Sequence, residues 1–439
     1  MMATVLLITL VQQPAATADT AAGRPCKVII DSVGRQARQV EVRRGETNVF
    51  AGGGVLAHCE GTGSTLAADS VAWFAGTGRF DMIGLANQVH IRDTAITLDA
   101  RFASYYLRQE RLEAHNRVVA VNRSTGSVLR GPNLTYYRAV KGVRDTLEMY
   151  ATGRPTIEYR DRPDSGEPYV IVADRVRFKG NDRMWGAGQV TIDRSDFAAR
   201  GDSMQLDQAA GFGVLVGKPR VEGKGTRSYK LTGTRIELGL RGREVRQVKA
   251  LGNGVATGSD WRLTADTIHL HIDRKKLQQA FAWGPRDSTH ARAVSTLQTI
   301  RADSLALDLP DEVLTEARGF GHALSTSKKD STAAASVDWI AGDSLTARWA
   351  QEPDPGGAGQ PKSKLHRLIS RGSARSLTHH YNQRDSLPSL NYSRGAMIDV
   401  LLKADRVDSV FVTGGANGVQ LEPKPPVPAD TAKKKPPSR

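Results

Sequence analysis

The sequence predicts an almost entirely β-stranded protein, built as a repetitive stack of short strands. Three observations point to this fold class: one strand motif recurs along the chain, no helical period of useful length is present, and the composition suits thin layers with many turns. Hydrophobic residues make up 39% of the chain and aromatic residues 6%, while glycine occurs 43 times. A thin repeated core therefore fits the chain better than the thick core of a large compact enzyme.

The recurring motif is a strand whose apolar side chains change face part-way along. In the copy LTADTIHLHI, Leu263 and Ala265 share one parity, whereas Ile268 and Leu270 have the other, because Asp266 intervenes. Alternate side chains of a strand face opposite sides, so keeping both apolar sets inside requires a corner or bulge at this step. Alanine is small enough for the inside of a bend, and aspartate can accept hydrogen bonds from nearby backbone N–H groups.

The motif occurs about ten times at intervals of roughly 30 to 50 residues, a range typical of solenoids, propellers and arrays. The residues at the change of parity are Asp69, Arg101, Pro132, Asp174, Asp202, Thr234, Asp266, Asp303, Asp343 and Ala396. A second strand follows each copy and ends in small residues, such as Gly252 and Gly254, which let neighbouring backbones approach closely. Each repeat is predicted to add strands at a spacing of roughly 4.8 Å.

Interruptions between the copies suggest how the chain is divided. We expect a signal peptide at 1–22, where the apolar run MATVLLITLV precedes small residues, and repeat blocks at 23–160 and 169–324. A third, loop-interrupted block is predicted at 337–420, and the Pro/Lys-rich segment 421–439 is predicted to be a disordered tail. The apolar run of the signal peptide is too short to span a bilayer.

The chain is strongly basic, with a formal net charge of +15 and a pI of about 9.9. Three classes of partner fit this charge: nucleic acid, an anionic membrane surface and an anionic glycolipid. The sequence contains no zinc-finger spacing and no aromatic-rich basic module of the RRM kind. We therefore expect no nucleic-acid partner.

The only two cysteines, Cys26 and Cys59, flank one predicted hairpin near the start of the chain. In an oxidising compartment they could form a disulfide that clamps the first turn. The alternative is two unrelated free thiols. We expect the disulfide if the protein is exported.

The sequence carries no recognisable catalytic constellation, since HExxH, GxSxG, SxxK and CxxC are all missing from it. His269 and His271 share one strand face and could hold a metal with a third ligand, but a solvated outer face is the simpler explanation. The corner aspartates recur evenly along the chain, whereas catalytic carboxylates form one tuned pair. We expect no catalytic residue, no metal site, no cofactor and no enzymatic activity.

The apolar residues that follow each corner allow two interpretations. In a closed sandwich they form only a core, whereas in a stack open along one edge they line a continuous groove suited to acyl chains, with basic side chains at its rim for phosphates. On the second interpretation the predicted lipid-contacting residues are Val71, Trp73, Val176, Phe178, Met204, Leu206, Ile236, Leu238, Ile268, Leu270, Leu305 and Leu307. The sequence alone does not distinguish the two.

The units LTADTIHLHIDRKKLQQAFAWG and IRADSLALDLPDEVLTEARGFG resemble the OstA-like repeats of the LptA family, which also form the amino-terminal domain of LptD. The shared pattern is an A-D-x-apolar-x-apolar strand, a polar turn, and a strand ending apolar-x-x-A-x-[AG]-x-G. The resemblance covers roughly Val49 to Gly418. The chain departs from a single-domain LptA-like carrier in its greater length, its two loop insertions and its Pro/Lys tail.

The resemblance implies a V-shaped, open β-jellyroll of antiparallel strands that shields lipid acyl chains between two sheets. It implies a periplasmic protein that can be peripheral to the outer membrane and that takes part in lipopolysaccharide transport or outer-membrane assembly. The implied partners are lipopolysaccharide or another anionic glycolipid, and other envelope lipid-transport components that pair end to end through terminal strands, with self-association by the same route.

Two alternatives remain beside the lipid carrier. One is a closed β-solenoid that acts as an envelope scaffold or adhesin without binding lipid. The other is a β-helix enzyme that acts on polysaccharide, which would show a single cleft with clustered carboxylates or basic residues.

Overall fold

The computed structural model describes residues 26–60, 62–160, 162–225, 227–242, 244–284, 290–295, 298–328, 337–352, 362–380, 388–403 and 406–422. Within these ranges the chain forms 32 β-strands, and its only helical segments are the 3-10 turns η1 (Leu107–Gln109) and η2 (Pro310–Glu312). The predicted all-β, repetitive fold is confirmed. The predicted signal peptide and nearly all of the predicted tail lie outside the described residues.

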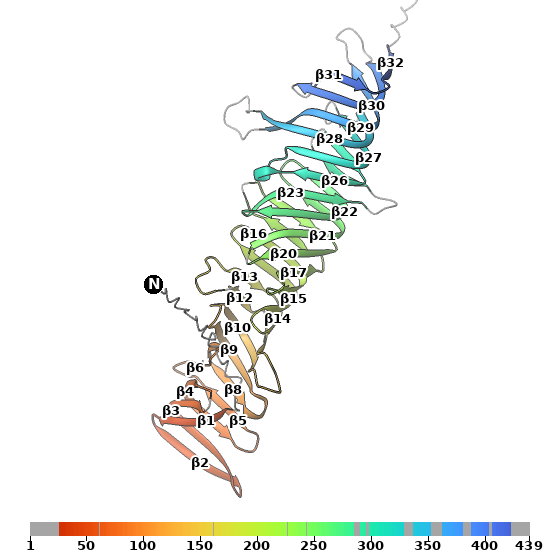
Figure 1. The fold of residues 1–439 in the computed structure, drawn as a ribbon. Coiled ribbons are helices and arrows are strands. Elements are labelled where there is room, and N and C mark those ends of the chain that lie inside the picture. The colour runs from red at the N-terminus through yellow and green to blue at the C-terminus, as the bar shows by residue number, and fades with distance from the viewer. Residues whose placement is uncertain are drawn as a thin grey trace, which may run out of the picture. The chain divides into compact units, whose positions relative to one another are not determined.

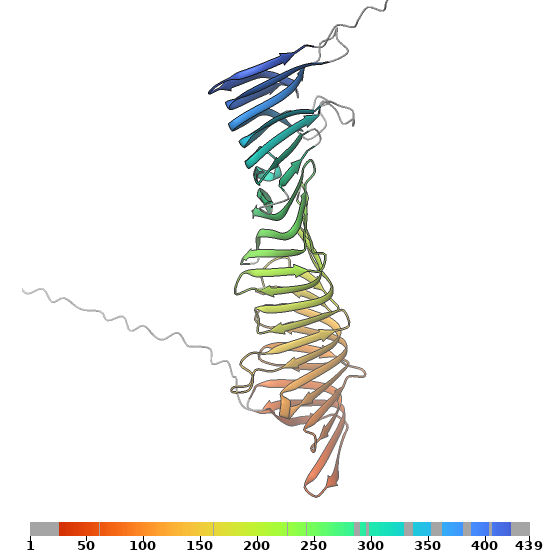
Figure 2. The same cartoon turned by 90° about the vertical axis from the view of Figure 1, so that its right-hand side faces the viewer.

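By its internal contacts the chain divides into two compact units, Met1–Val190 and Thr191–Arg439, which we call unit 1 and unit 2. Figures 1 and 2 show the strands of each unit stacked one after another. The division into three repeat blocks stays a prediction.

The strands of unit 1 form two antiparallel ladders. The strands are β1 (Lys27–Val33), β2 (Gln36–Arg43), β3 (Glu46–Glu60), β4 (Ser64–Phe74), β5 (Arg79–Ile83), β6 (Val89–Arg92), β7 (Ile96–Ala100), β8 (Phe102–Tyr106), β9 (Arg111–Asn122), β10 (Val128–Tyr137), β11 (Glu148–Thr152), β12 (Thr156–Tyr159), β13 (Tyr169–Val172), β14 (Arg175–Lys179) and β15 (Arg183–Arg194), which runs across the unit boundary. The first ladder has the order β1–β3–β4–β6–β7–β9–β10–β12–β13–β15. The second has the order β2–β3–β4–β5–β8–β9–β10–β11–β14–β15. The long strands β3, β4, β9, β10 and β15 belong to both ladders.

Unit 2 repeats this plan. Its strands are β16 (Phe197–Asp207), β17 (Phe212–Val216), β18 (Arg220–Gly223), β19 (Tyr229–Thr232), β20 (Arg235–Arg241), β21 (Glu244–Thr257), β22 (Arg262–Asp273), β23 (Lys276–Trp283), β24 (Ala291–Val294), β25 (Gln298–Ala302), β26 (Ser304–Asp308), β27 (Glu316–Lys328), β28 (Val337–Glu352), β29 (Lys362–His380), β30 (Ser389–Lys403), β31 (Arg406–Thr413) and β32 (Asn417–Leu421). The first ladder is β16–β18–β19–β21–β22–β24–β25–β27–β28–β29–β30–β32. The second is β16–β17–β20–β21–β22–β23–β26–β27–β28–β29–β30–β31.

The predicted change of parity is present in the strand that defined it. In β22 Leu263 is fully buried, Asp266 is exposed, and Ile268 and Leu270 are again fully buried. The register of β22 against β21 shifts at the same place, because Leu251 lies opposite Thr267 while Gly254 lies opposite Ala265. Two residues of β21 therefore oppose the single residue Asp266, which is the two-against-one count of a β-bulge.

The bulge residues share one backbone conformation. Opposite Asp174, the consecutive residues Gly188 and Gln189 both have positive φ, +81° and +46°. The N–H of Asp174 donates to the carbonyl oxygen of Gly188 (2.9 Å), which closes the corner. The same pairs of left-handed residues occur at Gly53–Gly54, Asn116–Arg117, Gly153–Arg154, Gly217–Lys218, Gly252–Asn253, Gly321–His322, Gly372–Ser373 and Gly414–Gly415.

Glycine is favoured at the first bulge position for two reasons. A positive φ is energetically unfavourable for a residue that has a Cβ atom. In addition, the backbone at the first bulge position lies in contact with the corner residue. A Cβ built on Gly188 would overlap the carboxylate of Asp174, and one built on Gly321 would overlap that of Asp303. The small residues that the sequence shows after each corner strand are thus explained by close packing at the bulge.

The corner aspartates use their carboxylates in different ways. Asp69 accepts the backbone N–H groups of Leu85 (2.6 Å), Ala86 (2.6 Å) and Asn87 (2.9 Å), as expected for an aspartate at a bend. The backbone hydrogen bond from Asn87 is the main cause that lowers the pKa of Asp69. Asp174 instead pairs with the guanidinium of Arg154 at 2.9 Å.

Among the described residues, the chain passes from one ladder to the other at the corners. In unit 1, β7 continues into β8 through Arg101, and in unit 2, β25 continues into β26 through Asp303. The hairpin turns on the opposite side, such as 75–78 between β4 and β5, join strands of the same ladder. The ladders of each unit are therefore linked along one side, the corner side. The opposite side, which we call the open side, has no described strand pairing between the ladders.

Replacing Gly188 by alanine should destabilise the protein by roughly 2–3 kcal/mol, because the new methyl group meets Asp174 at a residue with positive φ. The matched control is Gly166→Ala, where φ is +74° but no atom lies within 4 Å of a new Cβ. That change should cost only about 1 kcal/mol. Urea unfolding of both variants measures the difference. Equal losses would show that the close approach at the bulge has no energetic weight.

Candidate functional site

The twelve predicted lipid-contacting residues lie on interior rows of the second ladders. In unit 2 one row of directly paired positions contains Met204, Ile236, Ile268 and Leu305, with Leu215, Ala250 and Ala282 between them. The next row contains Leu206, Leu238, Leu270 and Leu307. In unit 1, Val71 and Val176 share one row, and Trp73 and Phe178 share the next. The register thus brings the predicted residues of each unit into two continuous strips.

Most of these side chains are buried, and the exceptions lie on one row. Nine of the twelve are buried, with exposed fractions of 0–6%. The half-buried ones are Trp73, Phe178 and Leu206, all in the row farther from the bulge. The incompletely covered side chains are therefore confined to the row nearer the open side, where Leu270 and Leu307 are nevertheless fully buried.

Unit 1 contains a cavity of about 70 Å³ between its two ladders. Leu66 and Ile91 line it from the first ladder, and Phe80, Met82 and Leu112 line it from the second. Phe80 and Leu112 belong to the same interior row as Trp73. The cavity is thus a hollow in one of the predicted apolar strips.

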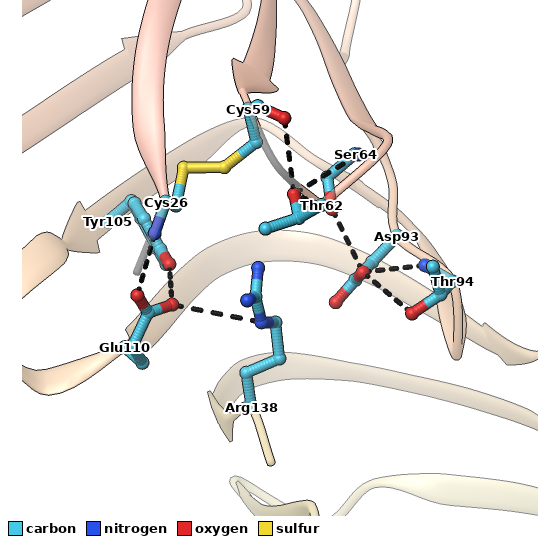
Figure 3. Close-up of a disulfide and its surroundings, with 9 residues drawn as sticks. All are labelled: Cys26, Cys59, Thr62, Ser64, Asp93, Thr94, Tyr105, Glu110 and Arg138. Carbon is cyan, nitrogen blue, oxygen red and sulfur yellow. Dashed lines mark hydrogen bonds and ion pairs between the residues drawn. A yellow bond between two sulfur atoms is a disulfide. The ribbon is translucent and has the colours of Figure 1, made fainter. Parts of the chain in front are cut away.

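A buried polar cluster borders the cavity (Figure 3). Glu110, 4% exposed, accepts the backbone N–H of Cys26 (2.9 Å) and the hydroxyl proton of Tyr105. The Nε of Arg138 lies 3.8 Å from the Oε2 of Glu110, and both side chains are almost fully buried. Burial, followed by the hydrogen bond to Glu110, raises the pKa of Tyr105 well above its ordinary value.

A second buried carboxylate lies on the other side of Arg138. Asp93 accepts hydrogen bonds from the hydroxyl of Ser64 (2.9 Å), the backbone N–H of Thr94 (2.6 Å) and the hydroxyl of Tyr136 (3.3 Å). Figure 3 shows Arg138 pointing into the space between Glu110 and Asp93. One cation between two buried carboxylates makes this region acidic, in contrast to the basic chain as a whole. No local sequence pattern marks these residues, which come from separate turns and strands.

Cys26 and Cys59 form a disulfide in the structure, with their Cα atoms 5.2 Å apart. Cys26 is buried and immediately precedes β1, whereas Cys59 lies near the end of β3. The bond therefore fixes the first strand of the first ladder beside the polar cluster. Through the Cys26 N–H it is also connected to the Glu110 carboxylate.

The histidines that the sequence singled out lie outside the interior. His269 faces away from Ile268 and Leu270 and packs against the ring of Phe281. Burial, with smaller effects from Lys249 and His271, lowers the pKa of His269. Among the residues that the structure describes, no group of three or more His, Cys, Asp or Glu side chains is placed to hold a metal ion.

A search of the described helices for a membrane span found no candidate of sufficient length and apolar character. The chain matches no protein-family model, and its comparison with curated proteins gave no match. The resemblance to OstA-like repeats thus stays a prediction from the residues themselves.

Removing the disulfide with Cys59→Ser should lower the free energy of unfolding by roughly 3–4 kcal/mol, because a closed loop with a sequence separation of 33 restricts the unfolded chain. Urea unfolding measures the loss, and the native chain treated with a reductant is the control, since it should unfold like the variant. Two alkylatable thiols in the unreduced native protein would contradict the bond.

Replacing Arg138 by methionine should destabilise the protein by roughly 3–5 kcal/mol, because it leaves Glu110 and Asp93 buried without their cation. Adding Glu110→Gln to this variant should recover part of the loss, since one buried charge is then removed. A double-mutant cycle followed by thermal unfolding measures both effects. If the two changes are simply additive, Arg138 and Glu110 do not interact.

Proposed function

We propose that this chain is a non-enzymatic lipid-binding protein of the cell envelope that shields acyl chains between its two ladders, as the resemblance to OstA-like repeats implies. One observation carries the proposal: in each unit two continuous apolar strips lie between ladders whose described strand connections lie on the corner side. The ladders can therefore separate on the open side without loss of ladder hydrogen bonds. An acyl chain that entered there would lie along the strips.

The energetics of burial support such a carrier. Each CH₂ group that moves from water into an apolar interior contributes about 0.8 kcal/mol, so part of one acyl chain already gives useful affinity. The half-buried Trp73, Phe178 and Leu206 offer contact surface nearest the open side. The net charge of +15 suits a phosphate-bearing glycolipid such as lipopolysaccharide, whose anionic groups would bind more weakly and with a dependence on salt.

The terminal strands supply the proposed contacts with other envelope components or with a second copy. Among the described pairings, β1 and β2 each pair with β3, and β31 and β32 each pair with β30. The last two strands also expose Val410, Phe411, Val419 and Leu421. Unpaired strand edges with exposed apolar side chains favour pairing with another strand. The proposed compartment is the periplasm, where a disulfide is stable.

A closed envelope scaffold is the second candidate. The observation in its favour is that nine of the twelve strip residues are already buried against protein, with exposed fractions of 0–6%. In such a scaffold the strips form a permanent core and no lipid enters. The two candidates differ in whether the strips contact lipid in the cell.

Photo-crosslinking residues at Ile268 and Leu270 should label lipid in cells, because both side chains belong to the interior strips. Matched crosslinkers at Thr267 and His269, the intervening positions on the outer face of the same strand, should not. Mass spectrometry of the labelled species identifies the lipid. Labelling from both faces alike, or from neither, would reject the carrier and leave the closed scaffold.

A further inference from the structure

Two pairs of arginines lie directly opposite each other on the outer face of the first ladder of unit 2. Arg292 of β24 lies opposite Arg301 of β25, and Arg375 of β29 lies opposite Arg394 of β30. All four residues are exposed, whereas Ile300, the residue next to Arg301 along β25, is buried. Since side chains alternate along a strand, the arginines point away from the interior.

The strand register places both pairs in one row across the ladder. Between the pairs this row contains Leu324 of β27 and Ala341 of β28, and beyond them it reaches Asn417 of β32. The neighbouring outward row, two residues farther from the corners, contains Val294, Thr299, Thr326, Trp339, Leu377, Tyr392 and Val419. We call these two rows together the basic face. It holds four arginines and no carboxylate.

Directly opposed arginines repel each other unless an anion lies beside them. The Cβ atoms of such cross-strand neighbours are about 4.5–5.5 Å apart, and like charges at these positions are destabilising. Elsewhere the chain supplies the anions itself, since Arg200 lies opposite Arg220 and the two pair with Asp193 and Glu222. On the basic face, by contrast, no described side-chain hydrogen bond, ion pair or cation–π contact involves any of the four arginines.

Other outward arginines also have partners within the chain. Arg348 and Arg367 lie opposite each other in the second ladder of unit 2, and both pair with a carboxylate. In unit 1, Arg111 is stacked 4.1 Å from the ring centre of Tyr106 and has a carboxylate neighbour as well. The basic face thus exposes guanidinium groups at positions where the chain elsewhere provides a partner, which indicates that its anions come from outside.

Apolar side chains lie beside the arginines on the same face. The ring centres of Trp339 and Tyr392 are 6.3 Å apart, and Leu377 lies between their strands. Val337 and Val419, at the edge of this group, are 38% and 54% exposed. Tryptophan and tyrosine favour the boundary between a membrane and water, because their rings are apolar and carry one polar group. Exposed cations beside such side chains match the headgroup layer of an anionic bilayer.

Single-stranded nucleic acid is the competing polyanion, since it also carries phosphates. Such strands bind where the faces of aromatic rings are open to the stacking of bases. Trp339 and Tyr392 are instead half-buried and packed on each other, with an angle of 61° between their planes. This arrangement favours the bilayer.

We propose that the basic face docks on an anionic phospholipid bilayer, with lipid phosphates between the opposed arginines and with Trp339 and Tyr392 at the headgroup layer. One phosphate can accept hydrogen bonds from two guanidinium groups, and its charge offsets the repulsion between them. The contact lies along an outer face of the first ladder. It therefore does not depend on whether lipid enters the interior.

The test measures cosedimentation of the full chain with vesicles made of equal parts phosphatidylglycerol and phosphatidylcholine. The native chain should bind these vesicles, bind pure phosphatidylcholine vesicles far more weakly, and dissociate as NaCl is added. Replacing Arg375 and Arg394 together by glutamine should weaken binding about twenty-five-fold, since each cation near an anionic surface contributes about a factor of five.

The matched control replaces Arg200 and Arg220 together by glutamine. These residues belong to the same row of the same ladder and carry the same charge, but they already have carboxylate partners. The control should bind like the native chain. Circular dichroism and the thermal midpoint verify folding, and Arg292→Gln with Arg301→Gln replaces the first variant if that variant does not fold.

Photo-crosslinking residues determine which side of the protein meets the bilayer. A crosslinker at Val337, next to the basic face, should label vesicle phospholipid. A crosslinker at Thr346 should not, because Thr346 lies in the same strand, β28, but on the outer face of the second ladder.

Four outcomes would overturn the proposal. The first is equal binding to the two kinds of vesicle, and the second is equal affinity of the folded Arg375 and Arg394 variant and its control. The third is equal labelling from Val337 and Thr346. The fourth is arginine-dependent binding of an oligo(dT) strand without binding of the vesicles, which would assign the face to nucleic acid. None of these outcomes affects the lipid carrier, which is tested by the interior crosslinkers at Ile268 and Leu270.

Discussion

The fold depends on one recurring backbone contact, in which the N–H of a corner residue donates to the carbonyl of a left-handed residue on the next strand. Bonds of this kind link Asp174 to Gly188, Asp202 to Gly217 and Asp303 to Gly321, at 2.9–3.1 Å. Each bulge turns its strand from one ladder to the other and exchanges the faces of its side chains. Apolar residues before and after the bulge therefore face the same interior, although they have opposite parity along the strand. One strand thus belongs to both ladders and contributes to a single continuous core.

The position of the corners also determines how the apolar interior is closed. Because the described crossings between ladders lie on the corner side, the ladder hydrogen bonds do not close the open side. Packing of the apolar strips closes it, together with single hydrogen bonds between turns, such as that from the Cys26 N–H to Glu110 and that from the Arg227 N–H to Glu312. Such packing is non-directional, so another apolar partner of suitable shape can replace it. This is the physical basis on which a lipid carrier and a closed scaffold can share one architecture.

The two faces of the second ladder of unit 1 carry opposite kinds of chemistry. Inside, one cation, Arg138, lies between the buried carboxylates Glu110 and Asp93, and these groups are satisfied by protein partners at a cavity wall. Outside, arginines are held on aromatic rings and remain accessible to solvent. The buried cluster with its disulfide fixes the first strands of the unit, whereas the stacked arginines place positive charge on the outer face. Alternation along each strand is what allows one ladder to carry both.

The sequence by itself determined the strand class, the positions of the corners and which residues point inward, because these follow from side-chain alternation within one strand. The Leu263 to Leu270 segment shows this, since a single extra residue at Asp266 is enough to indicate the bulge. The sequence left the disulfide open, and it gave no sign of the cluster of Glu110, Arg138 and Asp93 or of the stacking of Arg111 on Tyr106. These depend on which strands pair and in which register. Residues far apart along the chain become neighbours only through tertiary structure, so that part of the site was decided by the fold alone.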